Sequence, residues 1–197
     1  MGLPSVVCCL NRVIQKENTR MKRLICLVAI CLVAPLAARA QNAAANPLTA
    51  SLRFQFDDYA KNLVATAEIM PAEKYSFKPT PENMTFGKTI GHIGDVNNAI
   101  CSRLFTPPAT PFPKSSETDS KEKLVAGLKA SMDYCGEQFS KMTDANMADM
   151  VPFFGGKQIT RLGAALAVIT DFADHYAGLS MHLRLNGLLP PTAQKKM

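Results

Sequence analysis

The sequence lacks most of the motifs by which common enzyme classes are identified. It contains no glycine-rich dinucleotide fingerprint, no phosphate-binding loop and no GxSxG nucleophile motif. It also has no internal repeat and no convincing alternation of apolar and polar residues of the kind found in strands. These absences leave a helical domain whose chemistry must come from individual side chains.

A strong excess of charge is also lacking once the N-terminal region is set aside. The whole chain carries a formal net charge of +6, but six of its 22 Lys and Arg residues and one of its 16 acidic residues precede residue 41. Residues 41–197 therefore carry a net charge of only +1, and no basic cluster is interleaved with aromatic residues there. We expect no nucleic-acid partner.

The long apolar stretch near the N-terminus is typical of an export signal. The basic residues Lys22 and Arg23 precede the apolar run 24–36, and Ala38-Arg39-Ala40 has the small-x-small pattern of a signal peptidase site. The run is shorter than the roughly 20 residues of a membrane span, so no stable membrane anchor is expected. We interpret residues 21–40 as a cleaved signal peptide, preceded by an extension or a long basic region, and expect a periplasmic or secreted protein.

Residues 41–197 have a length typical of one domain with a single core. Four of the six cysteines lie before residue 41, which leaves Cys101 and Cys135. An even number of cysteines in an exported protein permits a disulfide, whereas two buried free thiols are the alternative. Neither cysteine lies in a CxxC motif, so a structural role is favoured over a redox role.

Apolar residues recur at steps of three and four in four segments, which predicts an all-α four-helix bundle. Pro71 ends the first helix, Thr85 caps the second, and Asp119 with Glu122 resembles a capping box that opens the third. The four predicted helices start or end near these residues and span about 52–70, 85–104, 119–142 and 160–186. Between the last two, we expect a short extended piece at 150–154 and a turn at Gly155-Gly156.

Three ionisable residues of the fourth predicted helix share one face. Asp171, His175 and His182 are spaced by four and seven residues, so they lie along one line of the helix. A buried carboxylate needs a partner, and His175 is the nearest candidate. A divalent metal would satisfy both side chains, and His92 of the second helix could supply a third ligand across the bundle.

The same residues also have an interpretation without a metal. An Asp and a His four residues apart often form an ion pair or hydrogen bond, and a histidine beside an apolar stripe is often a core residue. His182 lies about 10 Å along the helix from His175, too far to bind the same ion. It is better interpreted as a polar residue at the mouth of the bundle.

Two segments carry a resemblance to a known family. The loop and second helix MPAEKYSFKPTPENMTFGKTIGHIGDVN (70–97) and the ending DHYAGLSMHLRLNGLLPP (174–191) resemble the DinB-like family of four-helix-bundle proteins, over nearly all of residues 41–197. Many members resemble metal-dependent enzymes in which a histidine of the second helix and an H-x3-H pair of the fourth hold a divalent ion. Its better-understood branches are similar to thiol S-transferases.

The resemblance implies a site residue by residue. His92 matches the ligand of the second helix, His175 matches the second histidine of the pair, and Asp171 stands where the first would be. The implied ligand set is therefore His92, Asp171 and His175, with Zn, Ni, Fe or Mn as the ion. Tyr176 begins a segment that departs from the Arg-x-Gln continuation common in the family. Asp95 and Tyr176 are candidates for orienting the ligands, and Asp95 alternatively lies on a solvated face.

Two functions therefore remain open. One is an exported metal-dependent enzyme, either a thiol S-transferase or a hydrolase. Its partner would be a small molecule, for which a thiol is the candidate. The other is a non-catalytic bundle, with a degenerate metal site, that binds a ligand or a partner. A homodimer is compatible with both.

Overall fold

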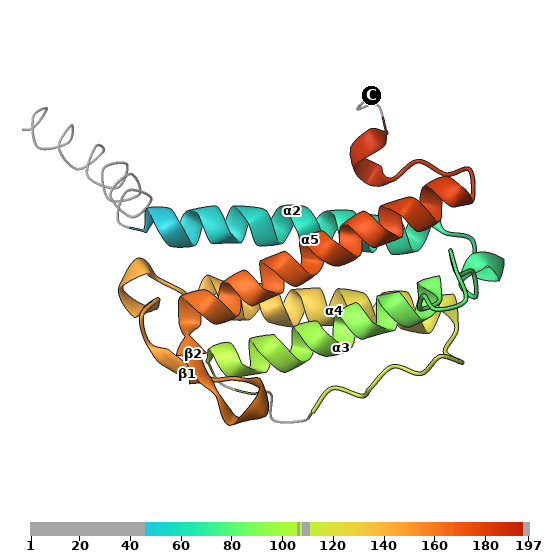
Figure 1. Cartoon of the computed structure of the whole chain (residues 1–197). Coiled ribbons are helices and arrows are strands. Elements are labelled where there is room, and N and C mark those ends of the chain that lie inside the picture. The colour runs from blue at the N-terminus through green and yellow to red at the C-terminus, as the bar shows by residue number, and fades with distance from the viewer. Residues whose placement is uncertain (1–45, 106, 108–110, 195–197) are drawn as a thin grey trace, which may run out of the picture. The chain divides into compact units, whose positions relative to one another are not determined.

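The computed structural model describes residues 46–105, 107 and 111–194, and the predicted export signal lies outside these residues. The chain from Pro47 onward forms one compact unit. Its four long helices are α2 (Pro47–Ile69), α3 (Phe86–Leu104), α4 (Lys121–Ser140) and α5 (Arg161–Leu185). The fold class predicted from helical periodicity is confirmed (Figure 1).

Each long helix packs against two others. The neighbours are α3 with α4, α3 with α5, α2 with α5, and α2 with α4, so the helices follow one another around the bundle in the order α2, α4, α3, α5. In Figure 1, α5 crosses the bundle between α2 and α3. Although α2 and α3 follow each other in sequence, they lie diagonally opposite each other in the bundle. This arrangement makes α3 and α5 direct neighbours.

The core is apolar, and all four helices contribute side chains to it. Leu63, Ile93, Phe139 and Leu179, one from each helix, are almost completely buried. Burial of such a side chain contributes about 1.5–3 kcal/mol. The rings of Phe56 and Phe139 stack 4.5 Å apart, which joins α2 to α4.

Side-chain caps define where three of the helices begin. Thr85 Oγ1 accepts a hydrogen bond from the backbone N of Lys88, and Thr160 Oγ1 accepts one from Gly163, both at 3.1 Å. The prediction for α4 was wrong by one residue: its cap is Ser120, whose Oγ accepts from Lys123 N at 3.3 Å. Asp119 instead accepts hydrogen bonds from Ser116 N at 2.9 Å and Lys123 Nζ at 2.6 Å.

Four single-turn 3-10 helices and a small hairpin complete the described chain. The turns are η1 (Ala72–Lys74), η2 (Asp144–Asn146), η3 (Phe154–Gly156) and η4 (Pro191–Ala193). The strands β1 (Met150–Pro152) and β2 (Gln158–Thr160) pair antiparallel, with Val151 opposite Ile159. The predicted extended piece and glycine turn are therefore confirmed, and Gly155 and Gly156 adopt the positive φ angles that favour glycine.

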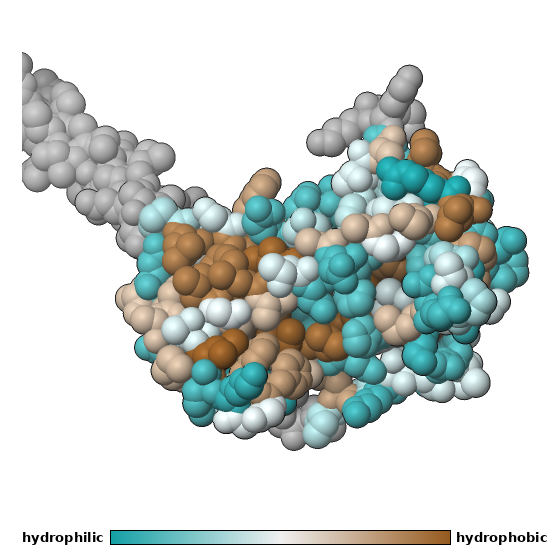
Figure 2. Space-filling model, viewed as in Figure 1, coloured by the Kyte–Doolittle hydropathy of each residue, from teal (hydrophilic) through white to brown (hydrophobic). Residues whose placement is uncertain are grey.

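α5 ends with a glycine cap. Gly187 has φ +74°, and the backbone N of Leu188 donates to the carbonyl of Leu183 at 2.9 Å, as in a Schellman motif. Among the described helices none is both long and apolar enough to cross a bilayer. Figure 2 shows apolar surface where the first turns of α2 and α5 face the viewer, and Phe54 and Leu166 are among the exposed apolar residues. The homodimer stays a prediction.

Candidate functional site

The bundle brings the three predicted site residues together from two neighbouring helices. The rings of His92 on α3 and His175 on α5 meet edge to face, with their centroids 5.1 Å apart. His175 Nε2 lies 3.5 Å from Asp171 Oδ1, one turn earlier on α5. The side chains of Asp171 and His175 are 25% and 14% exposed, so solvent reaches the site without filling it.

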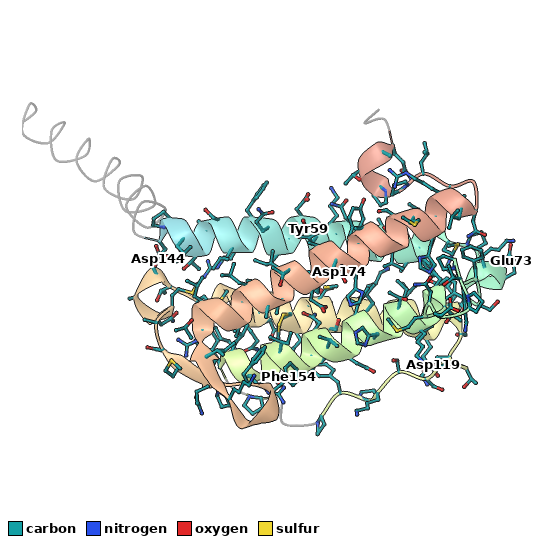
Figure 3. The ribbon with its side chains drawn as sticks, in the orientation of Figure 1. Tyr59, Glu73, Asp119, Asp144, Phe154 and Asp174 are labelled. Atoms are coloured by element: carbon teal, nitrogen blue, oxygen red, sulfur yellow. A yellow bond between two sulfur atoms is a disulfide. The ribbon has the colours of Figure 1, made fainter. Side chains whose placement is uncertain are left out.

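The carboxylate neighbours of His175 control its protonation. The hydrogen bond to Asp171 raises the pKa of His175, burial of the imidazole opposes that rise, and the charges of Asp171 and Asp174 add to it. Asp174 precedes His175 directly on α5 and is labelled in Figure 3. Sequence reasoning missed its contribution, although its adjacency to His175 was visible.

The donor set suits a divalent ion in kind. Two imidazoles that share a tetrahedral ion at about 2.0–2.1 Å have ring centroids roughly 5 Å apart, close to the separation of His92 and His175. Within the described residues, neither ring nitrogen of His92 has a hydrogen-bond partner, so its lone pair is available.

The side chains as placed do not form a ready coordination shell. Over the described part of the chain, no group of three or more His, Cys, Asp and Glu side chains is arranged to hold a metal ion. Instead, the two candidate metal ligands of α5, Asp171 and His175, contact each other. The three residues thus match a metal site in chemistry and location, and an ion would have to compete with the Asp171–His175 hydrogen bond.

His182 lies outside this group, as expected from its distance, and its side chain is buried. It is 7% exposed, and its ring lies against Phe77 and Phe86 with centroids 6.0 and 5.9 Å away. His182 Nδ1 lies 2.9 Å from the carbonyl oxygen of Gly178. The loop between α2 and α3 covers this end of α5, a tertiary contact that helical periodicity does not reveal.

Asp95 and Tyr176 each form hydrogen bonds with a connecting segment. Asp95 accepts hydrogen bonds from Ser115 N at 3.2 Å and Ser115 Oγ at 3.0 Å. The Tyr176 hydroxyl lies 2.8 Å from Thr192 Oγ1 and accepts from Thr192 N at 3.2 Å. Each therefore holds a connecting segment against a helix, and the predicted orienting roles are not supported by these contacts.

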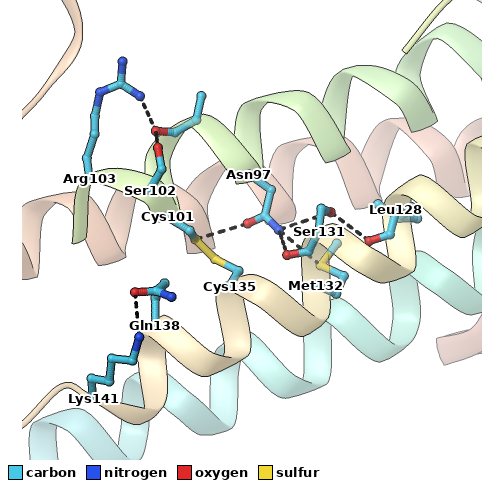
Figure 4. The surroundings of a disulfide bond; sticks show 11 residues. Asn97, Cys101, Ser102, Arg103, Leu128, Ser131, Met132, Cys135, Gln138 and Lys141 are labelled. Atoms are coloured by element: carbon cyan, nitrogen blue, oxygen red, sulfur yellow. Dashed lines mark hydrogen bonds between the residues drawn. A yellow bond between two sulfur atoms is a disulfide. The ribbon is translucent and has the colours of Figure 1, made fainter. Parts of the chain in front are cut away.

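The two cysteines are joined. Cys101 of α3 and Cys135 of α4 form a disulfide with a Cα separation of 5.3 Å (Figure 4), within the usual range. Next to it, Asn97 Nδ2 donates to the carbonyl of Ser131 at 2.9 Å, and Asn97 Oδ1 lies 3.5 Å from Cys101 Sγ. Of the two possibilities left open by the sequence, the structure has the bridge.

Comparison with solved structures gives a consistent fold. A DinB-like protein from Bacillus subtilis is 17% identical, with a TM-score of 0.59, covering 75% of this chain and 99% of that protein. A DinB-like protein from Bacillus cereus ATCC 10987 is 19% identical, with a TM-score of 0.55 and coverage of 68% and 89%. These identities establish the fold alone.

A third structural neighbour is the mycothiol-dependent maleylpyruvate isomerase. It is 12% identical, with a TM-score of 0.55, and the match covers 66% of this chain but only 60% of the isomerase. No curated protein matches the sequence. The sequence profile described as the DinB superfamily matches residues 55–178, which include all three candidate site residues. The chain therefore belongs to the DinB superfamily.

Proposed function

We propose that this DinB-superfamily protein binds a divalent metal ion through His92, Asp171 and His175 and acts on a low-molecular-weight thiol, as an S-transferase. The observation that carries the proposal is the contact of the His92 and His175 rings across α3 and α5, beside a carboxylate. Zn, Ni, Fe and Mn all suit two imidazoles and one carboxylate.

The protein residues would have separate parts in such a site. His92 offers an uncommitted imidazole from α3, and Asp171 and His175 offer a carboxylate and a second imidazole from α5. A bound divalent ion would lower the pKa of a coordinated thiol and make it nucleophilic at neutral pH. Asp171 would balance the ion's charge and, without the ion, raises the pKa of His175.

Support for the thiol is independent of the site geometry. A structural neighbour with the same fold is, by name, mycothiol-dependent, although its low identity shows fold alone. Hydrolysis of a small molecule by metal-bound water would use the same residues. The thiol reaction is favoured because of this neighbour and the resemblance of the family to thiol S-transferases.

Metal content tests the proposal. Protein purified without a histidine tag is compared with His92→Ala and His175→Ala, with His182→Gln as a control histidine that lies outside the site. We expect roughly one ion per chain in the wild type and the control, and loss of the ion in both alanine variants. Equal metal content in the wild type, His92→Ala and His175→Ala would exclude the site.

Binding of a thiol to the metal ion is tested by a separate measurement. In protein reconstituted with Co²⁺, a coordinated thiolate adds a ligand-to-metal charge-transfer band in the near ultraviolet. We expect the band on addition of cysteine and not on addition of serine. Metal binding without this band would keep the metal site and reject the thiol.

A second candidate is a non-catalytic bundle in which Asp171 and His175 form a structural pair. The observation that favours it is that no three-donor group is preformed within the described residues. It predicts that a chelator leaves the melting temperature unchanged. The metal-binding proposal predicts that the same chelator lowers it, because a ligand that binds only the folded state stabilises it.

We also propose that the protein is exported. The basic and apolar pattern of residues 21–40 supports export, and so does the Cys101–Cys135 disulfide, since disulfides persist in oxidising compartments. Sequencing the N-terminus of the protein recovered from the periplasm or medium should yield Gln41 as the first residue. Recovery of uncleaved protein in the cytoplasm alone would reject this proposal.

A further inference from the structure

One end of the bundle exposes most of its large apolar side chains. We name it the hairpin end: it consists of the first two turns of α2 and α5, the last turns of α3 and α4, and residues 141–160, which include β1 and β2 (Figure 1). Figure 2 shows apolar surface over the first turns of α2 and α5 there. In the described part of the chain, five of the eight exposed large apolar side chains lie at this end: Leu48, Phe54, Met150, Phe154 and Leu166. Such a concentration marks an interaction surface.

The hairpin presents two of these side chains on a fixed framework. Val151 of β1 is buried, and its neighbour Met150 is 59% exposed, as the alternation of a strand requires. Phe154 lies in the turn between the strands and is 43% exposed. Arg161 Nε of α5 donates to the carbonyl of Leu104 at 2.9 Å, which joins the base of the hairpin to α3.

Positive charge accompanies the apolar side chains. Over residues 46–194 as a whole, acidic residues outnumber basic ones. At the hairpin end the balance is reversed, with five basic residues and three acidic ones. The basic residues are Arg53, Arg103, Lys141, Lys157 and Arg161, and the acidic residues are Glu137, Asp144 and Asp149.

Two of the three carboxylates are already engaged, whereas two lysines are not neutralised. Asp149 pairs with Arg161 at 2.7 Å, and Asp144 accepts hydrogen bonds from the first turn of α2. Lys141 Nζ bonds to a neutral side-chain amide at 3.3 Å. Lys157 Nζ has no hydrogen bond or ion pair with a described residue. These two ammonium groups are available to an external anion.

Exposed apolar side chains beside uncompensated lysines suit an anionic lipid surface. The apolar groups enter the boundary between headgroups and acyl chains, and the lysines stay at the phosphates. A second copy of the chain would bring two positively charged ends together, which opposes a dimer through this surface. An acidic protein would satisfy the charge, but the path of the chain favours lipid. Since α2 begins at this end, the predicted signal peptide, residues 21–40, joins the bundle here.

We propose that the hairpin end docks the protein reversibly on an anionic bilayer, with Met150 and Phe154 inserted and Lys141 and Lys157 at lipid phosphates. This surface is separate from His92, Asp171 and His175. Only the argument from the path of the chain rests on the proposed export.

Vesicle sedimentation tests the docking. The full mature protein is mixed with vesicles of phosphatidylcholine, or of phosphatidylcholine and phosphatidylglycerol in equal parts. We expect roughly thirtyfold tighter binding to the anionic vesicles, since each of the two lysines contributes about fivefold near an anionic surface. Added salt should reduce this difference.

Paired variants locate the contact. Met150→Ser/Phe154→Ser should weaken binding to anionic vesicles about tenfold or more, because two apolar side chains no longer leave water. The matched control is Met181→Ser/Leu185→Ser, which removes side chains that are 59% and 58% exposed at the other end of α5. It should bind like the wild type. If the first variant melts at a lower temperature than the wild type, Met150→Ser alone replaces it.

A lysine pair tests the charge. Lys157→Gln should weaken binding to anionic vesicles about fivefold. Lys61→Gln, which removes an exposed charge of α2 outside the hairpin end, should change nothing. Equal binding of the wild type to neutral and anionic vesicles would reject the role of the lysines.

Two further outcomes would overturn the proposal. Absence of binding at millimolar lipid, or binding unchanged in the folded Met150→Ser variant, would show that this end does not meet the bilayer. A dimer in light scattering that Met150→Ser dissociates, without vesicle binding, would assign the surface to a second copy. The assay needs neither metal nor export, and His92→Ala should bind vesicles like the wild type. Failure here would therefore leave the metal and export proposals standing.

Discussion

Asp171 Oδ1 lies 3.5 Å from His175 Nε2, one turn apart on α5, and it is the main cause of the raised pKa of His175. Removing the charge in Asp171→Asn should lower that pKa. The pH titration of the His175 ring protons by NMR measures the change. The same titration of His182, which bonds to the Gly178 carbonyl and to no carboxylate of a described residue, provides the control.

The raised pKa of His175 determines how the stability of the folded protein changes with pH. A raised pKa in the folded state means that the pair's contribution is fully present below the unfolded pKa of about 6.5 and is lost as pH rises through the folded pKa. The wild type should therefore lose more stability than Asp171→Asn over this interval. Parallel curves of melting temperature against pH would contradict the pairing.

The disulfide between α3 and α4 should contribute strongly to stability. Cys101 and Cys135 are 34 residues apart, and closing a loop of that length contributes about 2–4 kcal/mol. Cys101→Ala/Cys135→Ala should lose this amount in urea denaturation. Reductant should lower the melting temperature of the wild type and leave the double variant unchanged. Sensitivity of the double variant to reductant would show another cause.

The loop before α3 is held by the buried hydroxyl of Tyr75. It donates to the carbonyl of Ala67 at 2.6 Å, and burial raises its pKa far above the ordinary value. Tyr75→Phe should cost about 0.5–1.5 kcal/mol, because the carbonyl loses its partner. Tyr59→Phe, whose hydroxyl has no hydrogen bond to a described residue, is the matched control. Equal losses in both would argue against the hydrogen bond.

A side chain at Gly87 would be crowded by Tyr75. A Cβ atom there would lie 3.1 Å from Tyr75 Cδ1 and 3.3 Å from the Tyr75 carbonyl oxygen. Gly87→Ala should therefore destabilise the protein by about 1–3 kcal/mol, although alanine is the better helix former. Gly136→Ala, where the nearest side-chain atom is 3.5 Å away, should be neutral or stabilising. Urea denaturation of the two variants decides the comparison.

Acid should weaken the start of α2. Asp144 accepts hydrogen bonds from the backbone N atoms of Leu48 and Thr49 and from Thr49 Oγ1, and the Thr49 hydroxyl is the main cause of its lowered pKa. With a lowered folded pKa, the contribution is present above the unfolded pKa of about 3.9 and is lost as pH falls through the folded value. Asp144→Ala should lower the melting temperature at pH 7 and lose less on acidification than the wild type.

The sequence predicted the features that depend on local order. Thr85 was identified as a cap, and the start of the last helix near residue 160 was predicted, because the signals that begin a helix act within about one turn. Asp119 was mistaken for a cap because Ser120, the true cap, is adjacent to it and both residue types suit that position. Local pattern cannot separate two such neighbours.

Features that depend on the packing of distant segments were only partly predictable. The three site residues were predicted from one helix face and a family resemblance, and the pairing of Asp171 with His175 was one of the two interpretations that the sequence left open. His182 was expected at the mouth of the bundle, and its burial was not predicted because the loop that covers it is remote in sequence. The hydrogen bond from Ser115 to Asp95 could not be predicted either, since it joins residues 20 positions apart.

The order of the helices along the chain sets the order in which the contacts of the bundle can form during synthesis. His92 emerges early, and both cysteines emerge with α3 and α4, so the disulfide can form before α5 exists. Asp171 and His175 arrive last, and α5 must dock between α2 and α3 to bring them to His92. Nascent chains that end before α5 would therefore be oxidised but unable to assemble the site, which makes the contact of the two histidines a marker of completed folding.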